Sequence, residues 1–276
     1  MNPSVAIRRG YAQMADGQLH YRCAGDPTAP VLLLLHQAPS SGAMFETMLP
    51  ELAGHFFCIA PDLPGCGQSD GIGSFAIASL SRALALALQQ EFSLGQWPLY
   101  LFGHHTGAAV ATELGAYHWP ETAALVLSGP PLLTDAQRTQ LAGFSLPQQA
   151  EDSSQFLSAL WQFIRAKDPK VSLSISLRET LSALQLGPAY RALYQAVAAY
   201  DMASALKATR CPVLAFAGWQ DSLRPALASC QALQPAIEVA EVGDYGTYVC
   251  EQAAEAVNRL IIAFCLRRSE HGSGTS

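Results

Sequence analysis

Residues 99–114 read LYLFGHHTGAAVATEL, and the order of residue types predicts a turn that could carry chemistry. Four apolar residues precede Gly103 and small residues follow Gly107, which indicates a strand, a sharp turn and a helix. The spacing Gly103-x-His105-x-Gly107 matches the turn that lifts a nucleophile above a sheet edge. Glycine is needed at both flanking positions because neighbouring backbone passes too close to leave room for a Cβ. A serine is usual at the central position, whereas an imidazole there would move protons.

The elements that must position this turn belong to a parallel sheet. Continuous apolar runs predict strands buried on both faces, at Val31–His36, Phe56–Asp62, Leu99–Phe102, Ala124–Ser128 and Val213–Gly218. Helix-length segments such as Ile77–Phe92 and Ala108–Tyr117 separate most of these runs, and ADGQ predicts a hairpin turn within Tyr11–Cys23. This order predicts an α/β fold with an open, mostly parallel sheet and flanking helices.

One long interval interrupts the alternation of strands and helices. More than eighty residues separate Ser128 from Val213, with helical periodicity at Gln149–Ala166, Ser174–Leu184 and Pro188–Tyr200. Because a structureless loop of that length is improbable in a compact domain, we expect an inserted helical cap. The predicted organisation is a core from residues 1–131 and 208–268, a cap from residues 132–207, and a disordered tail from residues 269–276.

Further motifs surround the turn in chain order: LLLHQAP (Leu33–Pro39), APDLPGCGQSD (Ala60–Asp70), CPVLAFAGWQDSLRP (Cys211–Pro225) and GDYGTYVCEQAAEAV (Gly243–Val257). Together with the glycine-flanked turn they resemble the α/β-hydrolase fold family over roughly residues 10–265. The resemblance implies an oxyanion-hole amide from the first motif and the triad acid at Asp221. It also implies that Thr247 stands at the position of the triad histidine.

The sequence departs from the family pattern at key positions. His105 replaces the nucleophilic serine, Thr247 replaces the triad histidine, and Gln37 replaces a glycine of the oxyanion loop. Asp221 alone of the triad is the residue that the pattern expects, which excludes an ordinary seryl-enzyme mechanism. Thr106 does not substitute for the serine, because the turn directs residue 105 into the pocket.

The remaining residues predict a His105–Asp221 dyad. The helix dipole favours a neutral imidazole at this turn, but a carboxylate within hydrogen-bond reach favours the protonated ring and should dominate. Such a dyad suits general acid–base catalysis, with the amides of Ala38 and Thr106 binding a developing oxyanion. Thr247 either leaves room for direct contact within the dyad or holds a water between the two groups.

We expect the pocket around the dyad to include His36, Gln37, Ser41, His104 and Trp219. His36 is expected to pack beneath the oxyanion loop, and His104 is expected to be structural or to line the pocket. A metal site formed by His36, His105 and Asp221 is an alternative, but these histidines lack helical or hairpin ligand spacing. We therefore expect no metal and no cofactor.

Composition excludes several classes of partner. The 276 residues are 50% hydrophobic and carry a net charge of −6 without a lysine or arginine cluster, so neither nucleic acid nor an anionic membrane is an expected partner. The seven cysteines contain no CxxC pair and are interpreted as reduced core residues. Because no apolar segment follows the N-terminal arginines, we expect a cytoplasmic location. The oligomeric state is left open.

Two functions fit these observations. The first is an enzyme that acts on a small, largely apolar carbonyl compound, of the ester, lactone or diketone type, through His105 and Asp221 instead of a serine. Hydrolysis by water, C–C cleavage and cofactor-free oxygenation are all open to such a site, with hydrolysis as the default. The second is a catalytically degenerate protein of the same fold that binds a ligand or an interaction partner.

Overall fold

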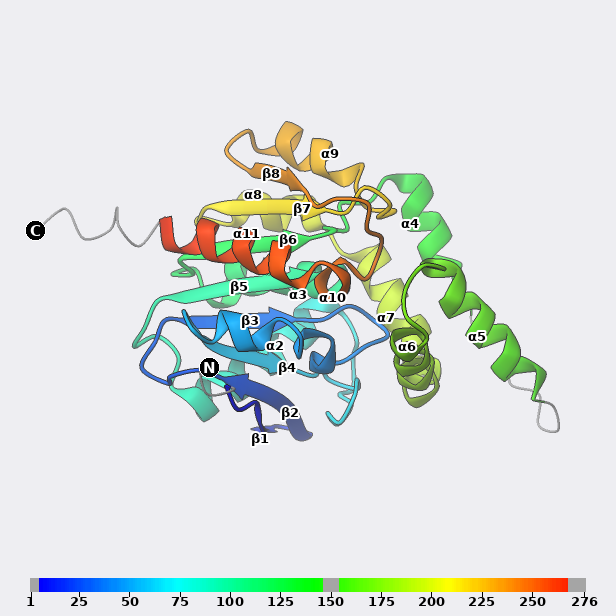
Figure 1. Cartoon of the computed structure of the whole chain (residues 1–276), viewed down its shortest axis with the longest axis horizontal. Coiled ribbons are helices and arrows are strands. Elements are labelled where there is room, and N and C mark those ends of the chain that lie inside the picture. The colour runs from blue at the N-terminus through cyan, green and yellow to red at the C-terminus, as the bar shows by residue number, and fades with distance from the viewer. Residues whose placement is uncertain (1–4, 146–153, 268–276) are drawn as a thin grey trace, which may run out of the picture.

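The computed structural model describes residues 5–145 and 154–267. Within these residues an eight-stranded sheet has the order β1-β2-β4-β3-β5-β6-β7-β8 (Figure 1). Strand β2 pairs antiparallel with β1 and β4, and the remaining pairs are parallel. The strands are β1 (Arg8–Met14), β2 (Gly17–Ala24), β3 (Val31–Leu35), β4 (Phe57–Pro61), β5 (Leu99–His104), β6 (Ala124–Ser128), β7 (Val213–Ala217) and β8 (Glu238–Glu241).

Every residue of β3 to β7 is buried, because helices cover both faces of the sheet. Successive side chains of a strand point to opposite faces, so Leu33 and Leu35 enter one core cluster while Leu32 and Leu34 enter the other. This double burial explains the continuous apolar runs in the sequence. Each of these strands begins and ends within two residues of its predicted bounds.

Helices on the two faces come from different parts of the chain. One face packs against η1 (Gly42–Phe45), α1 (Leu49–Leu52), α10 (Val249–Gln252) and α11 (Ala254–Arg267). The other packs against α2 (Ile77–Phe92), α3 (Thr106–Glu113) with its continuation η2 (Leu114–His118), and α9 (Ala226–Leu233). All seven cysteines are free, and all except Cys211 are buried, which agrees with their interpretation as core residues.

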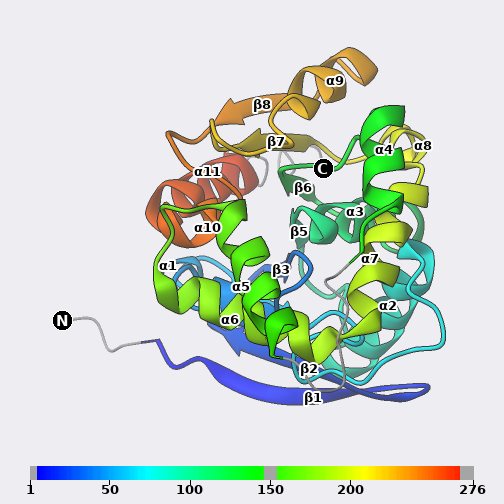
Figure 2. The same cartoon turned by 90° about the vertical axis from the view of Figure 1, so that its right-hand side faces the viewer.

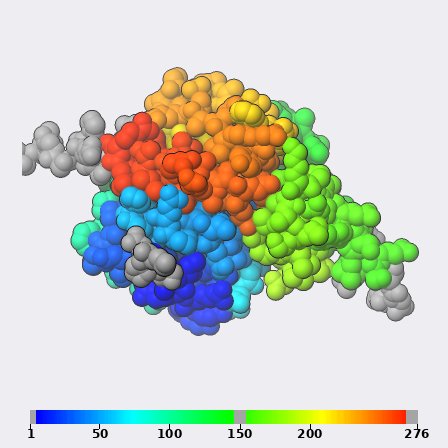
Figure 3. Space-filling model, viewed as in Figure 1, coloured from blue at the N-terminus to red at the C-terminus, as the bar shows by residue number. Residues whose placement is uncertain are grey.

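The described part of the interval between β6 and β7 is mainly helical. It contains α4 (Asp135–Ala142), α5 (Gln155–Lys167), α6 (Leu173–Leu186), α7 (Pro188–Ala199) and α8 (Met202–Ala208), of which α4 to α7 are called the inserted helices below. They lie beyond the carboxyl ends of β5, β6 and β7 and project from one side of the molecule (Figures 1 and 3). In Figure 2, where this side faces the viewer, α4 lies beside α7, and α5 lies beside α6.

Parts of the predicted organisation lie outside the described residues. They are residues 149–153 of the first predicted cap helix and the expected tail at 269–276. In the described part of the chain, no helix combines the length and the apolar character that crossing a membrane requires.

The close approach of α3 to the sheet predicts the effect of one methyl group. A Cβ on Gly107 would lie 2.0 Å from Leu35 O, whereas a Cβ on Gly71 would meet no atom within 4 Å. Although alanine favours helices, we expect Gly107→Ala to lower the free energy of unfolding by about 1–3 kcal/mol or more through overpacking. Gly71→Ala is the matched control and should stay within about 0.5 kcal/mol of the parent. Urea denaturation followed by circular dichroism measures both, and equal stabilities would contradict the predicted packing.

Candidate active site

His105 occupies the turn between β5 and α3 in a strained backbone conformation. Its φ of 49° and ψ of −110° are values that non-glycine residues seldom adopt. Backbone hydrogen bonds hold the turn on both sides: the His105 amide donates to Ser128 O at 2.9 Å, and His105 O accepts from Ala108 N at 2.8 Å. The strand, the turn and the helix therefore present the His105 side chain at the carboxyl end of the sheet.

The imidazole of His105 contacts the carboxylate that the sequence predicts as its partner. Nε2 of His105 lies 2.8 Å from Oδ2 of Asp221, and their side chains are 16% and 0% exposed. Asp221 follows β7, and its Oδ1 accepts from Leu223 N at 2.8 Å. A carboxylate accepts, so Nε2 carries the proton of a neutral ring and Nδ1 keeps a lone pair. Within the described residues, the ring makes no other hydrogen bond.

The charge of Asp221 is fixed by this contact. Burial by itself raises the pKa of Asp221, but the neighbouring His105 imidazole and the Leu223 amide outweigh burial and lower this pKa to about 2. Asp221 is therefore an anion throughout the neutral pH range. As an acceptor that stays charged, it orients the His105 ring.

Gly129 makes room for the dyad, and the sequence analysis did not identify it. Its φ is +54°, and a Cβ there would lie 2.4 Å from Cδ2 of His105 and 2.9 Å from Oδ2 of Asp221. The available signal was a glycine immediately after the buried strand β6, in the segment LSGPP. Such a position often marks a close approach of side chain to backbone.

Thr247 contacts the other unusual residue, Gln37, instead of bridging the dyad. Its Oγ1 donates to Gln37 Oε1 at 3.1 Å. Gln37 Nε2 in turn lies 3.4 Å from Oε2 of Glu179, a fully buried carboxylate of α6. His105 and Asp221 are in direct contact, so of the two possibilities left open by the sequence, Thr247 leaves room and does not hold a water between them.

The two predicted oxyanion donors lie beside one another. Ala38 and Thr106 both line the pocket, and Ala38 N is 3.4 Å from Oγ1 of Thr106. Thr106 is the first residue of α3, where helix amides have no acceptor within the helix. The Ala38 N–H donates to the Thr106 hydroxyl, beside the His105 turn.

A pocket of about 460 Å³ opens above His105 between the sheet and the inserted helices. Gln37 lines it, as predicted, and Thr247 does so as well. The remaining described lining is mostly apolar or amide-bearing: Ala38, His105, Thr106, Pro131, Leu133, Gln137, Gln140, Leu141, Phe144, Phe163, Lys167, Tyr194, Val197, Gln220, Ser222 and Leu223.

The predicted pocket residues His36 and His104 lie beneath the pocket and do not line it. Nδ1 of His36 donates to Gln37 O at 2.7 Å, and its Nε2 accepts from Leu63 N at 2.8 Å. His104 is also fully buried, with Nε2 donating to Thr247 O at 2.8 Å and Nδ1 2.9 Å from Ser128 Oγ. Both rings are neutral, and their hydrogen bonds join loops to the sheet.

Ser41 and Trp219 were also predicted to line the pocket, and the structure places them elsewhere. Ser41 caps η1, where its Oγ accepts from Ala43 N at 3.3 Å. Trp219 is 54% exposed in the loop after β7, and its amide donates to Gly243 O. Loop direction, which the sequence does not encode locally, decides both positions.

The alternative metal site of His36, His105 and Asp221 is contradicted by the hydrogen bonds. Both ring nitrogens of His36 are already occupied by the Gln37 carbonyl and the Leu63 amide. Across residues 5–145 and 154–267, no cluster of three or more histidine, cysteine, aspartate or glutamate side chains could hold a metal ion.

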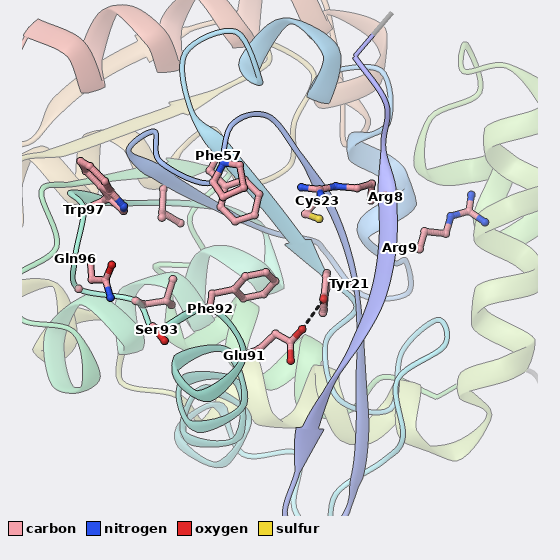
Figure 4. Close-up of a pocket in the computed structure, with 14 residues that line it drawn as sticks. Arg8, Arg9, Tyr21, Cys23, Phe57, Glu91, Phe92, Ser93, Gln96 and Trp97 are labelled. Carbon is pink, nitrogen blue, oxygen red and sulfur yellow. Dashed lines mark hydrogen bonds between the residues drawn. The ribbon is translucent and has the colours of Figure 1, made fainter.

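A second pocket, of about 440 Å³, lies at the opposite end of the sheet (Figure 4). It includes the first residues of β3 and β4, Val31 and Phe57, and is crossed by a 2.7 Å hydrogen bond from the Tyr21 hydroxyl to Glu91. Because His105 stands at the carboxyl end of β5, this pocket takes no part in the candidate active site.

Comparisons with known proteins agree with this architecture. The α/β hydrolase fold family matches residues 30–253. An uncharacterized hydrolase of Saccharomyces cerevisiae is 38% identical over 104 residues, which cover 37% of this chain and 36% of the yeast protein. Lipase LipV of Mycobacterium tuberculosis is 31% identical over 179 residues, covering 61% of this chain and 64% of the lipase. The matches thus span less than two thirds of these relatives.

A solved structure extends the likeness to the whole fold. The crystal structure of E-2-(acetamidomethylene)succinate hydrolase superposes with a TM-score of 0.76 at 22% identity, covering 94% of this chain and 99% of that chain. At that identity the superposition establishes fold and not activity. With the family match over residues 30–253, the chain belongs to the α/β hydrolase fold family.

The buried histidines predict how stability depends on pH. Burial, with a smaller contribution from neighbouring His105, lowers the pKa of His104 to about 3, and burial lowers the pKa of His36 to about 4. The unfolded chain therefore binds more protons below pH 6.5, and the stability that these neutral rings provide above that pH is lost as the pH falls. Each ring contributes up to about 1.4 kcal/mol per pH unit.

The free energy of unfolding should fall between pH 6.5 and pH 4. We expect His104→Gln to reduce the slope of this fall by about 1.4 kcal/mol per pH unit, which corresponds to one proton taken up on unfolding. Urea titrations at a series of pH values measure this slope. A second variant, His36→Gln, should reduce it similarly. A slope unchanged by either substitution would show that these rings accept protons in the folded state.

Proposed function

We propose that this chain is an enzyme of the α/β hydrolase fold that acts on a small, largely apolar carbonyl compound without a serine nucleophile. The single observation that supports it best is the direct contact of His105 with Asp221 at the strained turn. An ester, lactone or diketone is the substrate type that this site suits. In this proposal residues 132–207 serve as a cap over the site.

The chemistry follows from the proton on Nε2. Asp221 accepts the hydrogen bond from Nε2–H and so keeps the proton on Nε2. Nδ1 of His105 can then accept a second proton from a water molecule as the water oxygen adds to the substrate carbonyl. The resulting oxyanion accepts hydrogen bonds from the Ala38 and Thr106 amides. Nδ1 then returns its proton to the leaving group as the tetrahedral intermediate collapses. Removal of a proton from carbon by the same Nδ1 would begin C–C cleavage or oxygenation.

A second candidate, a ligand-binding protein without turnover, is favoured by two contacts. The threonine at the triad-histidine position is engaged with Gln37, and the Ala38 amide already faces the Thr106 hydroxyl. The first contact engages the residue at the triad-histidine position, and the second engages an amide that the first candidate assigns to the oxyanion. Turnover of esters, lactones and β-diketones above the buffer rate by the purified protein separates the two candidates.

Removal of the Asp221 charge should abolish most activity. With Asp221→Asn, Nε2 of His105 loses its charged acceptor and the protonated ring loses its stabilisation, so we expect kcat to fall by about 10²–10⁴-fold. Steady-state kinetics on the best substrate of the panel measure the change. Asp244→Asn is the matched control, since Asp244 is an exposed carboxylate that pairs with Lys170 at 3.0 Å.

Loss of activity by the control as well would assign the effect to general destabilisation. Full activity in a folded Asp221→Asn variant would remove the proposed mechanism. Circular dichroism of both variants verifies the fold.

Restoring two side chains should create ordinary esterase chemistry. His105→Ser supplies a nucleophile and Thr247→His supplies its base, while Asp221 and the residues proposed as oxyanion donors, Ala38 and Thr106, are kept. Because triad members act as a unit, the gain should be strongly non-additive. We expect the double variant to hydrolyse a small activated ester and to form a covalent adduct with a serine-directed phosphonate.

Mass spectrometry of the phosphonate-treated protein detects the adduct. The parent and both single variants serve as controls and should form none. A folded double variant without an adduct would show that Asp221 or the oxyanion loop does not support serine catalysis, and would favour the ligand-binding candidate.

A further inference from the structure

The pocket above His105 contains a cation that the mechanism does not use. Lys167, the last residue of α5, is the single lysine, arginine, aspartate or glutamate among the described residues that line the pocket. Its Nζ donates to the hydroxyl oxygens of Tyr190 at 2.8 Å and Tyr194 at 3.1 Å. In the described part of the chain, no carboxylate lies within 4 Å of this ammonium.

Aromatic rings surround the Lys167 ammonium. Nζ lies 5.4 Å from the ring centre of Phe163, 5.5 Å from that of Tyr190 and 5.7 Å from that of Tyr194. The ring of Phe144 packs against all three. Cation–π contacts offset part of the cost of desolvating the ammonium, but they supply no counter-charge. The site therefore retains an attraction for an anion.

Lys167, Tyr190 and Tyr194 have more hydrogen-bond donors than their mutual contacts use. An ammonium has three N–H groups, of which the two tyrosine oxygens take two. The hydroxyl oxygens of Tyr190 and Tyr194 are 3.1 Å apart, so one of the two hydroxyls donates a hydrogen bond to the other. Tyr194 lines the pocket and Tyr190 is fully buried. In the arrangement in which Tyr190 donates to Tyr194, the O–H of Tyr194 is therefore left for a ligand. One N–H and one O–H remain for a ligand.

We propose that Lys167 and Tyr194 bind the carboxylate of the substrate, so that the proposed carbonyl chemistry acts on a small organic acid. Two free donors match the two oxygens of one carboxylate, and a charged donor gives a short, strong hydrogen bond. The apolar side chains of Leu133, Leu141 and Val197 would cover the body of the same molecule. This assignment rests on the proposed function only in placing the reacting carbonyl at His105.

Equilibrium binding tests the site without requiring turnover. The probes are phenylalkanoates of graded chain length, each compared by calorimetry with its neutral primary amide. We expect at least one carboxylate to bind about tenfold or more tightly than its amide. Lys167→Met should remove this preference while the Kd of the amide stays nearly constant. Lys170→Met is the matched control, because Lys170 is exposed and pairs with Asp244.

A second variant covers the case in which Lys167→Met does not fold. Tyr194→Phe keeps the ring and removes the hydroxyl that faces the pocket, so it should reduce the carboxylate preference severalfold. A purely structural role for Lys167, joining α5 to α7, would lower stability without changing the ratio of carboxylate to amide affinity.

Several results would overturn the proposal: no binding of any probe, equal binding of acid and amide, or a preference that survives Lys167→Met. Tighter binding of a phenylalkyl phosphate than of the carboxylate would overturn the choice of anion. Failure of the proposed function is distinguishable, because Asp221→Asn should lose turnover and keep the carboxylate preference. Conversely, loss of the preference in Lys167→Met by a protein without turnover would support this site and remove the catalytic mechanism.

Discussion

The close passage of α3 against β3 and β5 is the constraint on which the rest of the site depends. Gly103 and Gly107 let backbone approach backbone at distances that no Cβ permits, since a Cβ on either would lie 2.0–2.2 Å from a carbonyl oxygen. That proximity places His105, the residue between them, at a positive φ. The hydrogen bonds of its backbone offset the conformational strain. These backbone contacts fix the turn and present the side chain of His105 at the carboxyl end of the sheet.

The two unusual residues Gln37 and Thr247 form one local rearrangement. Thr247 donates its hydroxyl hydrogen bond to Gln37, and Asp221 accepts from His105. A histidine at position 247 would be a second possible donor to Asp221. The side-chain amide of Gln37 is satisfied at both ends: its Oε1 accepts from Thr247, and its Nε2 donates to Glu179. The contacts of His105 with Asp221 and of Thr247 with Gln37 therefore join residues from distant points of the chain.

Much of this arrangement could be predicted from the sequence, because burial on both faces gives each central strand an unbroken apolar run. The edge strand β8 was missed, since its residues Glu238–Glu241 are only partly buried and resemble a loop. His105, Asp221 and Gln37 were identified from motif positions. Lys167 was not, because it lies on a helix whose placement over the sheet depends on long-range packing and not on any local motif.

The inserted helices also act on the oxyanion loop. Glu179 of α6 is fully buried, and its Oε1 accepts from Ser40 Oγ at 2.8 Å and from Arg178, which is paired with Glu251 of α10. Burial raises the pKa of Glu179, while Arg178 and Ser40 oppose that effect. Because an unpaired buried carboxylate is costly, this network holds α6, the loop before η1 and α10 in one arrangement. The position of the loop that carries Ala38 therefore depends on a carboxylate of α6 that lies outside the pocket lining.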